Sequence, residues 1–276
     1  MEDKNQKKIF FHVGTGKTGT TFLQYRIFPK LKGIYYIQRT RFRRAKTIIN
    51  NTRYEKYLLS REFDQQLEKR VRSFAEDFPE TTAIIVFRRH DSYIASQYRR
   101  FVKNGFTGSF TEFFDVENDK GYFKKKDLDY FRQIGILEEN FTSKPIVLFY
   151  EDFSKDSRAF IDKLVKLLGV SVNYNRLNLK RKHSSYSEKQ LKAIMAAGKY
   201  INLRKRRIFK SGILHFFMRL SLGSMRYPIL FFGKCMPVKC FTKEPLIPEA
   251  ELEKVKAYYQ DDWEECYEYA EKILVK

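Results

Sequence analysis

A glycine- and threonine-rich run near the amino end has the residue types that bind a phosphate-like group. The run at 14–21 reads Gly-Thr-Gly-Lys-Thr-Gly-Thr-Thr and lies between an apolar segment and a helical pattern. Glycines allow the backbone N–H groups to curl inward, and the start of a helix adds partial positive charge. Lysine adds a full charge, and threonine hydroxyls add further donors. We expect the anion to contact Gly16, Lys17, Thr18, Gly19, Thr20 and Thr21.

The end of this loop, Gly16-Lys17-Thr18, also matches the end of the Walker A motif of ATP- and GTP-binding proteins. That motif has another glycine five positions before its last glycine, and Phe11 stands there instead. The sequence also has no convincing apolar strand that ends in a magnesium-binding aspartate. A P-loop kinase that uses ATP and magnesium therefore stays an alternative of lower weight.

Two further groups of residues follow apolar segments that we predict to be strands. Arg88 directly follows the segment 82–87, and Ser96 lies eight positions later in a predicted helix. A guanidinium and a hydroxyl from these places can bind one phosphate through charge and paired hydrogen bonds. The segment 146–150 is followed by Glu151, which we expect to brace the end of the sheet rather than to catalyse.

Taken in order, these three groups resemble the PAPS-dependent sulfotransferase family. That family has a strand followed by Pro-Lys-[Thr/Ser]-Gly-[Thr/Ser]-[Thr/Ser], and here Gly16 replaces the proline. The resemblance implies that the loop holds the phosphosulfate of PAPS, that Arg88 and Ser96 bind its 3′-phosphate, and that no metal is required. The resemblance covers residues 8–170 well and the rest only loosely. Within the family, it is strongest to the bacterial carbohydrate sulfotransferases. It therefore implies transfer of a sulfuryl group from PAPS to a hydroxyl of a carbohydrate or a lipid-linked glycan.

Transfer to a hydroxyl needs a group that removes its proton. Glu62 is the first candidate, because it follows a short apolar run and precedes a helical pattern, as a glutamate does in a similar Ser-x-Glu element of bacterial sulfotransferases. A glutamate in the first turn of a helix also favours the helix dipole without any catalytic role. Lys17 is expected to stabilise charge on the leaving phosphate. His90 and His12 are further candidates for the base, and His12 lies in a strand that we predict to be buried.

The candidate site residues can meet at one edge of a sheet only if parallel strands carry them. Apolar runs predict strands at 9–13, 33–37, 57–59, 82–87 and 146–150. Helical patterns occupy 18–28, 63–78, 92–103 and 158–168. The alternation predicts an α/β fold with a P-loop-NTPase-like central parallel sheet flanked by helices, which binds ligands at the carboxyl ends of its strands. We expect one sulfotransferase-like domain over 1–276, with a nucleotide-binding core at 1–170 and a helical, basic C-terminal third at 171–276.

The segment 189–243 has no acidic residue and contains thirteen lysines and arginines. Apolar residues recur in it at near-helical spacing, and such a stripe most often packs in a core. These residues are Phe209, Ile213, Phe216, Phe217 and Leu220. Three interpretations stay open: a solvated basic face, a groove for an acidic polysaccharide, or contact with an anionic membrane surface. An acidic, aromatic helical segment follows Pro248, and we expect it to dock on the domain.

The composition indicates a folded chain with anionic partners. Hydrophobic residues make up 43% of it, and the formal net charge is +21. Three cysteines without metal-ligand spacing indicate a reducing compartment, and we find no signal peptide or membrane-spanning stretch. We therefore expect a cytoplasmic protein, with peripheral contact to the inner face of the membrane as an option. A basic nucleic-acid-binding protein is the non-enzymatic alternative, but no signature of such a protein supports it, and we expect no nucleic-acid partner.

Overall fold

The chain forms two compact units in the computed structural model. The structure describes residues 7–179, 186–204 and 209–274, without the side chains of Arg219 and Leu274. Lys205, Arg206 and Arg207 of the predicted basic segment lie outside the described residues. The first unit comprises Met1–His90, Lys126–Lys180 and Tyr259–Lys276, and the second comprises Asp91–Lys125 and Arg181–Tyr258. The division of one domain at residue 170 stays a prediction.

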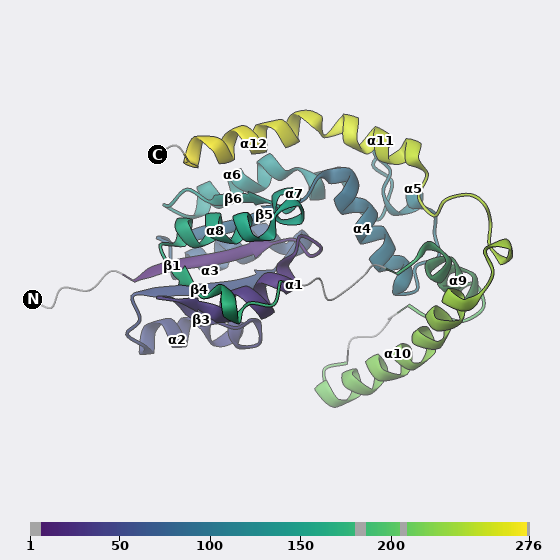
Figure 1. The fold of residues 1–276 in the computed structure, drawn as a ribbon, viewed down its shortest axis with the longest axis horizontal. Helices are drawn as coiled ribbons and strands as arrows, with labels where there is room; N and C mark the ends of the chain where they lie inside the picture. Colours follow the sequence, from purple (N-terminus) through teal and green to yellow (C-terminus); the bar gives the residue numbers. More distant parts are fainter. Residues whose placement is uncertain (1–6, 180–185, 205–208, 275–276) are drawn as a thin grey trace, which may run out of the picture. The chain divides into compact units, whose positions relative to one another are not determined.

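The first unit is built on a five-stranded sheet in which every neighbouring pair of strands is parallel (Figure 1). The strand order is β3-β4-β1-β5-β6. The strands are β1 (Lys8–Gly14), β3 (Tyr35–Ile37), β4 (Lys56–Glu62), β5 (Thr82–Phe87) and β6 (Ile146–Phe149). Their continuous apolar runs are typical of parallel strands that are buried on both faces. The predicted α/β class with a central parallel sheet is confirmed.

Helices cover both faces of this sheet (Figure 1). One face packs on α2 (Ala45–Asn51), α3 (Leu67–Ala75), α6 (Tyr130–Asn140) and α12 (Gln260–Leu274). The other face packs on the segment after the loop and on α8 (Ser157–Leu168). Alternate residues of a strand point to opposite faces, so that Phe11 belongs to the first core and Phe10 to the second. Cys266 and Ala270 of α12 are buried in the first core, so this second half of the acidic C-terminal segment docks on the first unit.

Two elements next to the loop differ from the sequence expectation. The predicted helix at 18–28 is divided into α1 (Thr20–Phe22), a π-helix (Leu23–Ile27) and a 3₁₀ turn (Phe28–Lys30). The strand expected at 57–59 extends to Glu62, because β4 pairs with β1 along its whole length, up to the pair of Gly14 and Glu62. Glu62 therefore ends a strand and does not begin a helix.

The second unit is mainly helical. It contains most of α4 (His90–Lys103), α5 (Phe110–Phe113), α9 (Glu188–Gly198), α10 (Gly212–Cys235) and α11 (Glu249–Tyr258). α10 packs closely on α9 where Gly233 has no side chain, since a Cβ there would lie 2.7 Å from the Cβ of Ala193. Leu230, one turn earlier, is buried against α9. Among the helices within the described ranges, none has both the length and the apolar composition needed to cross a membrane.

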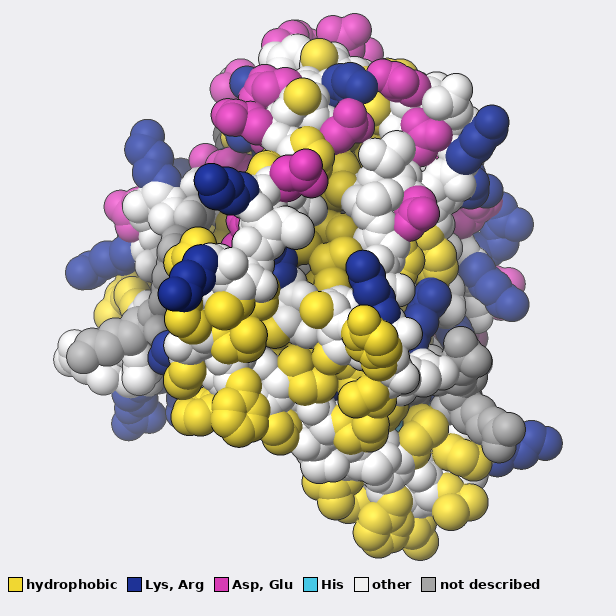
Figure 2. All heavy atoms as spheres, turned by 90° about the vertical axis from the view of Figure 1, so that its right-hand side faces the viewer, with side chains coloured by type: hydrophobic (Ala, Val, Ile, Leu, Met, Phe, Trp, Pro, Cys, Tyr) yellow, Lys and Arg dark blue, Asp and Glu magenta, His cyan; other side chains and the backbone are white. Residues whose placement is uncertain are grey.

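The amino-terminal part of α10 does not pack in a core. Four of the apolar residues expected to form a core stripe are largely exposed: Ile213 71%, Phe216 61%, Phe217 59% and Leu220 57%. Phe231 and Phe232 farther along the helix are exposed to a similar extent. The hydrophobic stripe of α10 is therefore a surface feature, and hydrophobic side chains gather at the lower end of the face shown in Figure 2.

Candidate nucleotide-binding site

The glycine loop leaves the carboxyl end of β1 and makes its turn at two left-handed residues. Lys17 has φ of 77° and Gly19 has φ of 82°. Glycine takes this conformation freely, whereas a lysine does so at a cost of about 1–2 kcal/mol. The Lys17 side chain is exposed. A lysine held in a strained turn, with its side chain turned outward at the end of a central strand, has the features of a functional residue.

The amide of Gly16 already binds an oxyanion within the chain. Its N–H donates to Oδ1 of Asp64 at 2.8 Å. A proline at this position would have no N–H to donate, so the replacement of the family's proline by Gly16 adds a donor to the loop. Asp64 is a site residue that sequence reasoning missed, because nothing in its neighbourhood indicates contact with a loop 48 positions earlier.

The threonine hydroxyls of the loop have different partners. Thr18 Oγ1 donates to the carbonyl oxygen of Thr15 at 2.9 Å, and its side chain is buried. Thr20 Oγ1 donates to Oε1 of Glu62. Thr21 is exposed. Two of the three predicted donor hydroxyls thus stabilise the loop and its neighbouring strand in this structure.

Glu62 lies beside the loop because β4 is the neighbour of β1. The register pairs Gly14 with Glu62, and the N–H of Phe63 donates to the Gly14 carbonyl oxygen at 3.0 Å. The Glu62 carboxylate is half-buried and accepts the Thr20 hydroxyl at the start of α1. The structure therefore brings the predicted base and the predicted phosphate loop to the same edge of the sheet.

Arg88 reaches the same loop from the other side of β1. It directly follows β5, and its Nη1 donates to the carbonyl oxygen of Lys17 at 3.1 Å. Its guanidinium lies 4.6 Å from the ring centre of Tyr150, a contact that orients the side chain. Ser96 is half-buried in α4 and belongs to the second unit, so its convergence with Arg88 stays a prediction.

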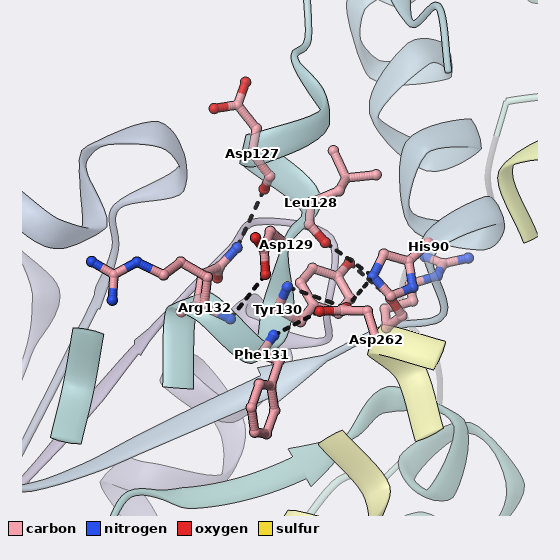
Figure 3. A network of polar contacts seen from close by, with 10 residues as sticks. His90, Asp127, Leu128, Asp129, Tyr130, Phe131, Arg132 and Asp262 are labelled. Atoms are coloured by element: carbon pink, nitrogen blue, oxygen red, sulfur yellow. Dashed lines mark hydrogen bonds and ion pairs between the residues drawn. The ribbon is translucent and has the colours of Figure 1, made fainter. Parts of the chain in front are cut away.

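Figure 3 shows a polar network around His90, Tyr130 and Asp262. The Tyr130 hydroxyl donates to the Arg88 carbonyl oxygen at 2.9 Å. His90 is stacked between Tyr130 and Tyr259, with ring centres 4.0 and 4.4 Å apart, and its Nε2 lies 2.9 Å from Oδ2 of Asp262. Asp262 also accepts the N–H groups of residues 130 and 131. The network ties the end of β5 to α6 and α12, and sequence reasoning did not anticipate it.

Glu151 has the bracing position that the sequence predicts. Its Oε1 accepts the N–H of Arg89 at 3.0 Å, which joins the end of β6 to the end of β5. Burial raises the pKa of this carboxyl above its ordinary value.

No protein-family model matches the sequence, and no curated relative matches it. Among solved structures, the chain is similar to a sulfotransferase from Alicyclobacillus acidocaldarius, with 18% identity, a TM-score of 0.50, and coverage of 70% of this chain and 92% of that one. The chain has a sulfotransferase fold. It is also similar to the mouse sulfotransferase SULT7A1 complexed with PAP, with 17% identity, 61% of each chain covered and a TM-score of 0.41.

Within this sulfotransferase fold, His12 is a core residue. It lies in the middle of β1 and is 1% exposed, and its Nδ1 is 2.7 Å from Oγ of Ser60. Gln24 Nε2 donates to the same hydroxyl at 2.9 Å. Burial lowers the pKa of His12 to about 4, so the ring is neutral at pH 7. These contacts indicate a structural role for His12 beneath the loop.

Proposed function

We propose that the protein transfers a sulfuryl group from PAPS to a hydroxyl of a carbohydrate or a lipid-linked glycan. The observation that carries this proposal is the meeting of three predicted residues, Lys17, Glu62 and Arg88, around one loop at the carboxyl edge of the sheet. PAPS supplies a sulfuryl group attached to a phosphate leaving group. The sulfotransferase fold supports the choice of donor.

The residues have separate roles in the proposed reaction. Glu62 takes the proton of the acceptor hydroxyl as its oxygen bonds to sulfur. The bond between sulfur and the bridging oxygen breaks, and Lys17 and the loop N–H groups stabilise the charge left on the phosphate. Arg88, with Ser96, binds the 3′-phosphate that distinguishes PAPS from ATP. Because lysine and amide donors can stabilise this charge, we expect the reaction to proceed without a metal.

Calorimetric titration with PAP, the nucleotide that remains when PAPS has lost its sulfuryl group, tests the donor site in the presence of EDTA. We expect PAP to bind, and Arg88→Ala to weaken its binding by about 10- to 100-fold, the effect of losing a charge-assisted hydrogen-bond pair. ADP lacks the 3′-phosphate, so its weaker binding should be the same in both proteins. Arg53→Ala, an exposed arginine before the amino end of β4, is the matched control.

The outcomes separate the proposed function from its rivals. An equal loss of PAP and ADP binding in Arg88→Ala would mean that the arginine only shapes the loop through its contact with Lys17. Binding of ATP in magnesium, without binding of PAP, would identify a P-loop kinase. Binding of DNA or RNA with steep salt dependence, and of neither nucleotide, would identify a nucleic-acid-binding protein.

We also propose that the stripe of exposed apolar residues on α10 rests on an anionic membrane surface, where a lipid-linked acceptor would be present. Ile213, Phe216, Phe217 and Leu220 follow one another at helical spacing, and exposure of such large side chains to water is unfavourable. The surrounding segment 189–243 has no carboxylate and many cations, which complements anionic lipid headgroups. The predicted cytoplasmic location, at the inner face of the membrane, belongs to this proposal.

Sedimentation with lipid vesicles tests the α10 surface. We expect binding to phosphatidylglycerol vesicles and much weaker binding to phosphatidylcholine vesicles. Phe216→Ser with Phe217→Ser should lower the binding by about tenfold or more, because two aromatic side chains no longer enter the interface. Tyr25→Ser with Phe131→Ser removes two exposed aromatic residues elsewhere and should have no effect. Equal binding of the two double variants would contradict a role for α10.

A further inference from the structure

A cluster of arginines lies at the carboxyl edge of the sheet next to Glu62. The 3₁₀ helix Arg39–Arg44 begins two positions after β3, and it contains four arginines, all of them exposed. The register pairs Ile37 at the end of β3 with Leu59 of β4. The chain after β3 therefore emerges beside Arg61 and Glu62, the last two residues of β4.

The positive charges of this cluster act on one another at Arg61. The pKa of Arg61 lies below its ordinary value, first because the side chain is partly buried and then because Arg39, Arg43 and Arg70 place positive charge near it. Glu62 acts in the opposite direction. Within the described residues, no ion pair joins Arg39, Arg43 or Arg61 to a carboxylate. Several positive charges offset by the single carboxylate of Glu62 repel one another, and an anionic ligand would relieve this repulsion.

The core of the first unit holds part of this cluster in place. The guanidinium carbon of Arg61 lies 5.9 Å from the ring centre of Phe42, the one half-buried residue of the 3₁₀ helix. Phe42 in turn packs on Phe11 of β1 and on Phe63, with ring centres 5.6 and 5.9 Å apart. Arg61 is therefore supported by packed aromatic rings, and the 3₁₀ helix is anchored beside it.

The strand order separates this cluster from the donor residues. Arg88 follows β5, on one side of β1, whereas Arg61 and the 3₁₀ helix lie on β4 and β3, on the other side. The loop and Glu62 lie between them. A donor bound by the loop and Arg88 leaves the arginines on the β4 side for the other substrate, and Glu62 is the boundary between the two.

We propose that Arg39, Arg43 and Arg61 bind an acidic group of the acceptor, so that the acceptor is an anionic oligosaccharide and not a neutral one. This acidic group is an oxyanion, either the carboxylate of a uronic acid or a sulfate ester. The guanidinium group of arginine binds both kinds of oxyanion through paired hydrogen bonds. Arg61 and Glu62 are the last two residues of β4, so an acceptor held at this edge of the sheet can bring a neighbouring sugar hydroxyl to Glu62. The inference rests on the proposed function, since it assigns the acceptor of that reaction.

Calorimetry with three tetrasaccharides in the presence of PAP tests the arginine site. The probes are a sulfated, glucuronate-containing tetrasaccharide, its desulfated form, and neutral cellotetraose. We expect the acidic probes to bind and the neutral one not to bind. Arg39→Ala with Arg43→Ala should weaken binding of the acidic probes by about 10- to 100-fold, because charge-assisted hydrogen bonds are lost. The desulfated probe shows whether carboxylates alone are sufficient or sulfate esters are needed.

A second double variant controls for the overall positive charge. Arg53→Ala with Lys144→Ala removes the same charge just before β4 and β6, at the opposite edge of the sheet, and should bind the acidic probes normally. Equal losses in the two double variants, or equal binding of neutral and acidic probes, would overturn the inference. PAP affinity should be the same in all variants, and thermal melting confirms folding. Failure of every protein to bind PAP would refute the proposed donor, whereas the arginine site would be judged from the same probes without PAP.

Discussion

Lys17→Met is expected to lower kcat for sulfuryl transfer by about 100- to 1,000-fold, the usual effect of removing one donor that stabilises charge in a transition state. Methionine keeps most of the length of the side chain but has no charge. The charge on the leaving phosphate grows as the bond to sulfur breaks, so the loss should be greater in kcat than in PAP affinity. Release of PAP, measured with an acceptor found by screening, gives the rate.

Lys17→Gly separates the charge from the backbone. Lys17 has φ of 77°, which glycine adopts without strain, so this variant should be at least as stable as the wild type. It should nevertheless be as inactive as Lys17→Met. The control is Lys30→Met, an exposed lysine of the 3₁₀ turn Phe28–Lys30, which should have normal activity. A glycine variant with substantial activity would show that the strained turn matters and the ammonium group does not.

Glu62→Gln should lower kcat by about 100- to 10,000-fold, the range typical of general-base catalysis. Glutamine keeps an amide oxygen that can accept the Thr20 hydroxyl, so the loop should hold its place and PAP should bind as before.

The matched control is Glu76→Gln, an exposed glutamate just after α3. It makes the same chemical change on the same unit and should leave the rate unaltered. Thr20→Val removes the hydroxyl that Glu62 accepts but keeps the carboxylate. If Glu62→Gln and Thr20→Val reduced PAP binding alike, with no separate loss in kcat, Glu62 would be a residue that positions the loop and not the base.

Local sequence patterns were sufficient to predict most strands of the central sheet. Continuous apolar runs flanked by polar turns predicted the strands that became β1, β5 and β6, because strands buried on both faces need such runs. They were less informative for β4, whose last residues Arg61 and Glu62 are charged. The pairing of β4 with β1 extends the strand to Glu62, and no pattern in a single segment reveals a pairing partner elsewhere in the chain.

For helices too, a local pattern does not reveal which other element packs against the segment, as α10 shows. Its apolar residues recur at helical spacing, which predicts a helix and a preference for a buried face. Burial depends on whether another element covers that face. α9 covers the side of α10 that carries Leu230 and Gly233, and the stripe at Ile213 and Phe216 remains exposed.

The sequence by itself determined the residue types of the site: a glycine loop with one lysine, a glutamate after one apolar run and an arginine after another. It also determined the class of sheet, because local hydrophobic periodicity is encoded within each segment. Only the tertiary structure decided which of these residues meet. Thr20 contacts Glu62 across 42 positions, Gly16 contacts Asp64 across 48, and Arg88 contacts Lys17 across 71. Such contacts arise from strand order and register, which depend on the packing of the whole unit and not on any local pattern.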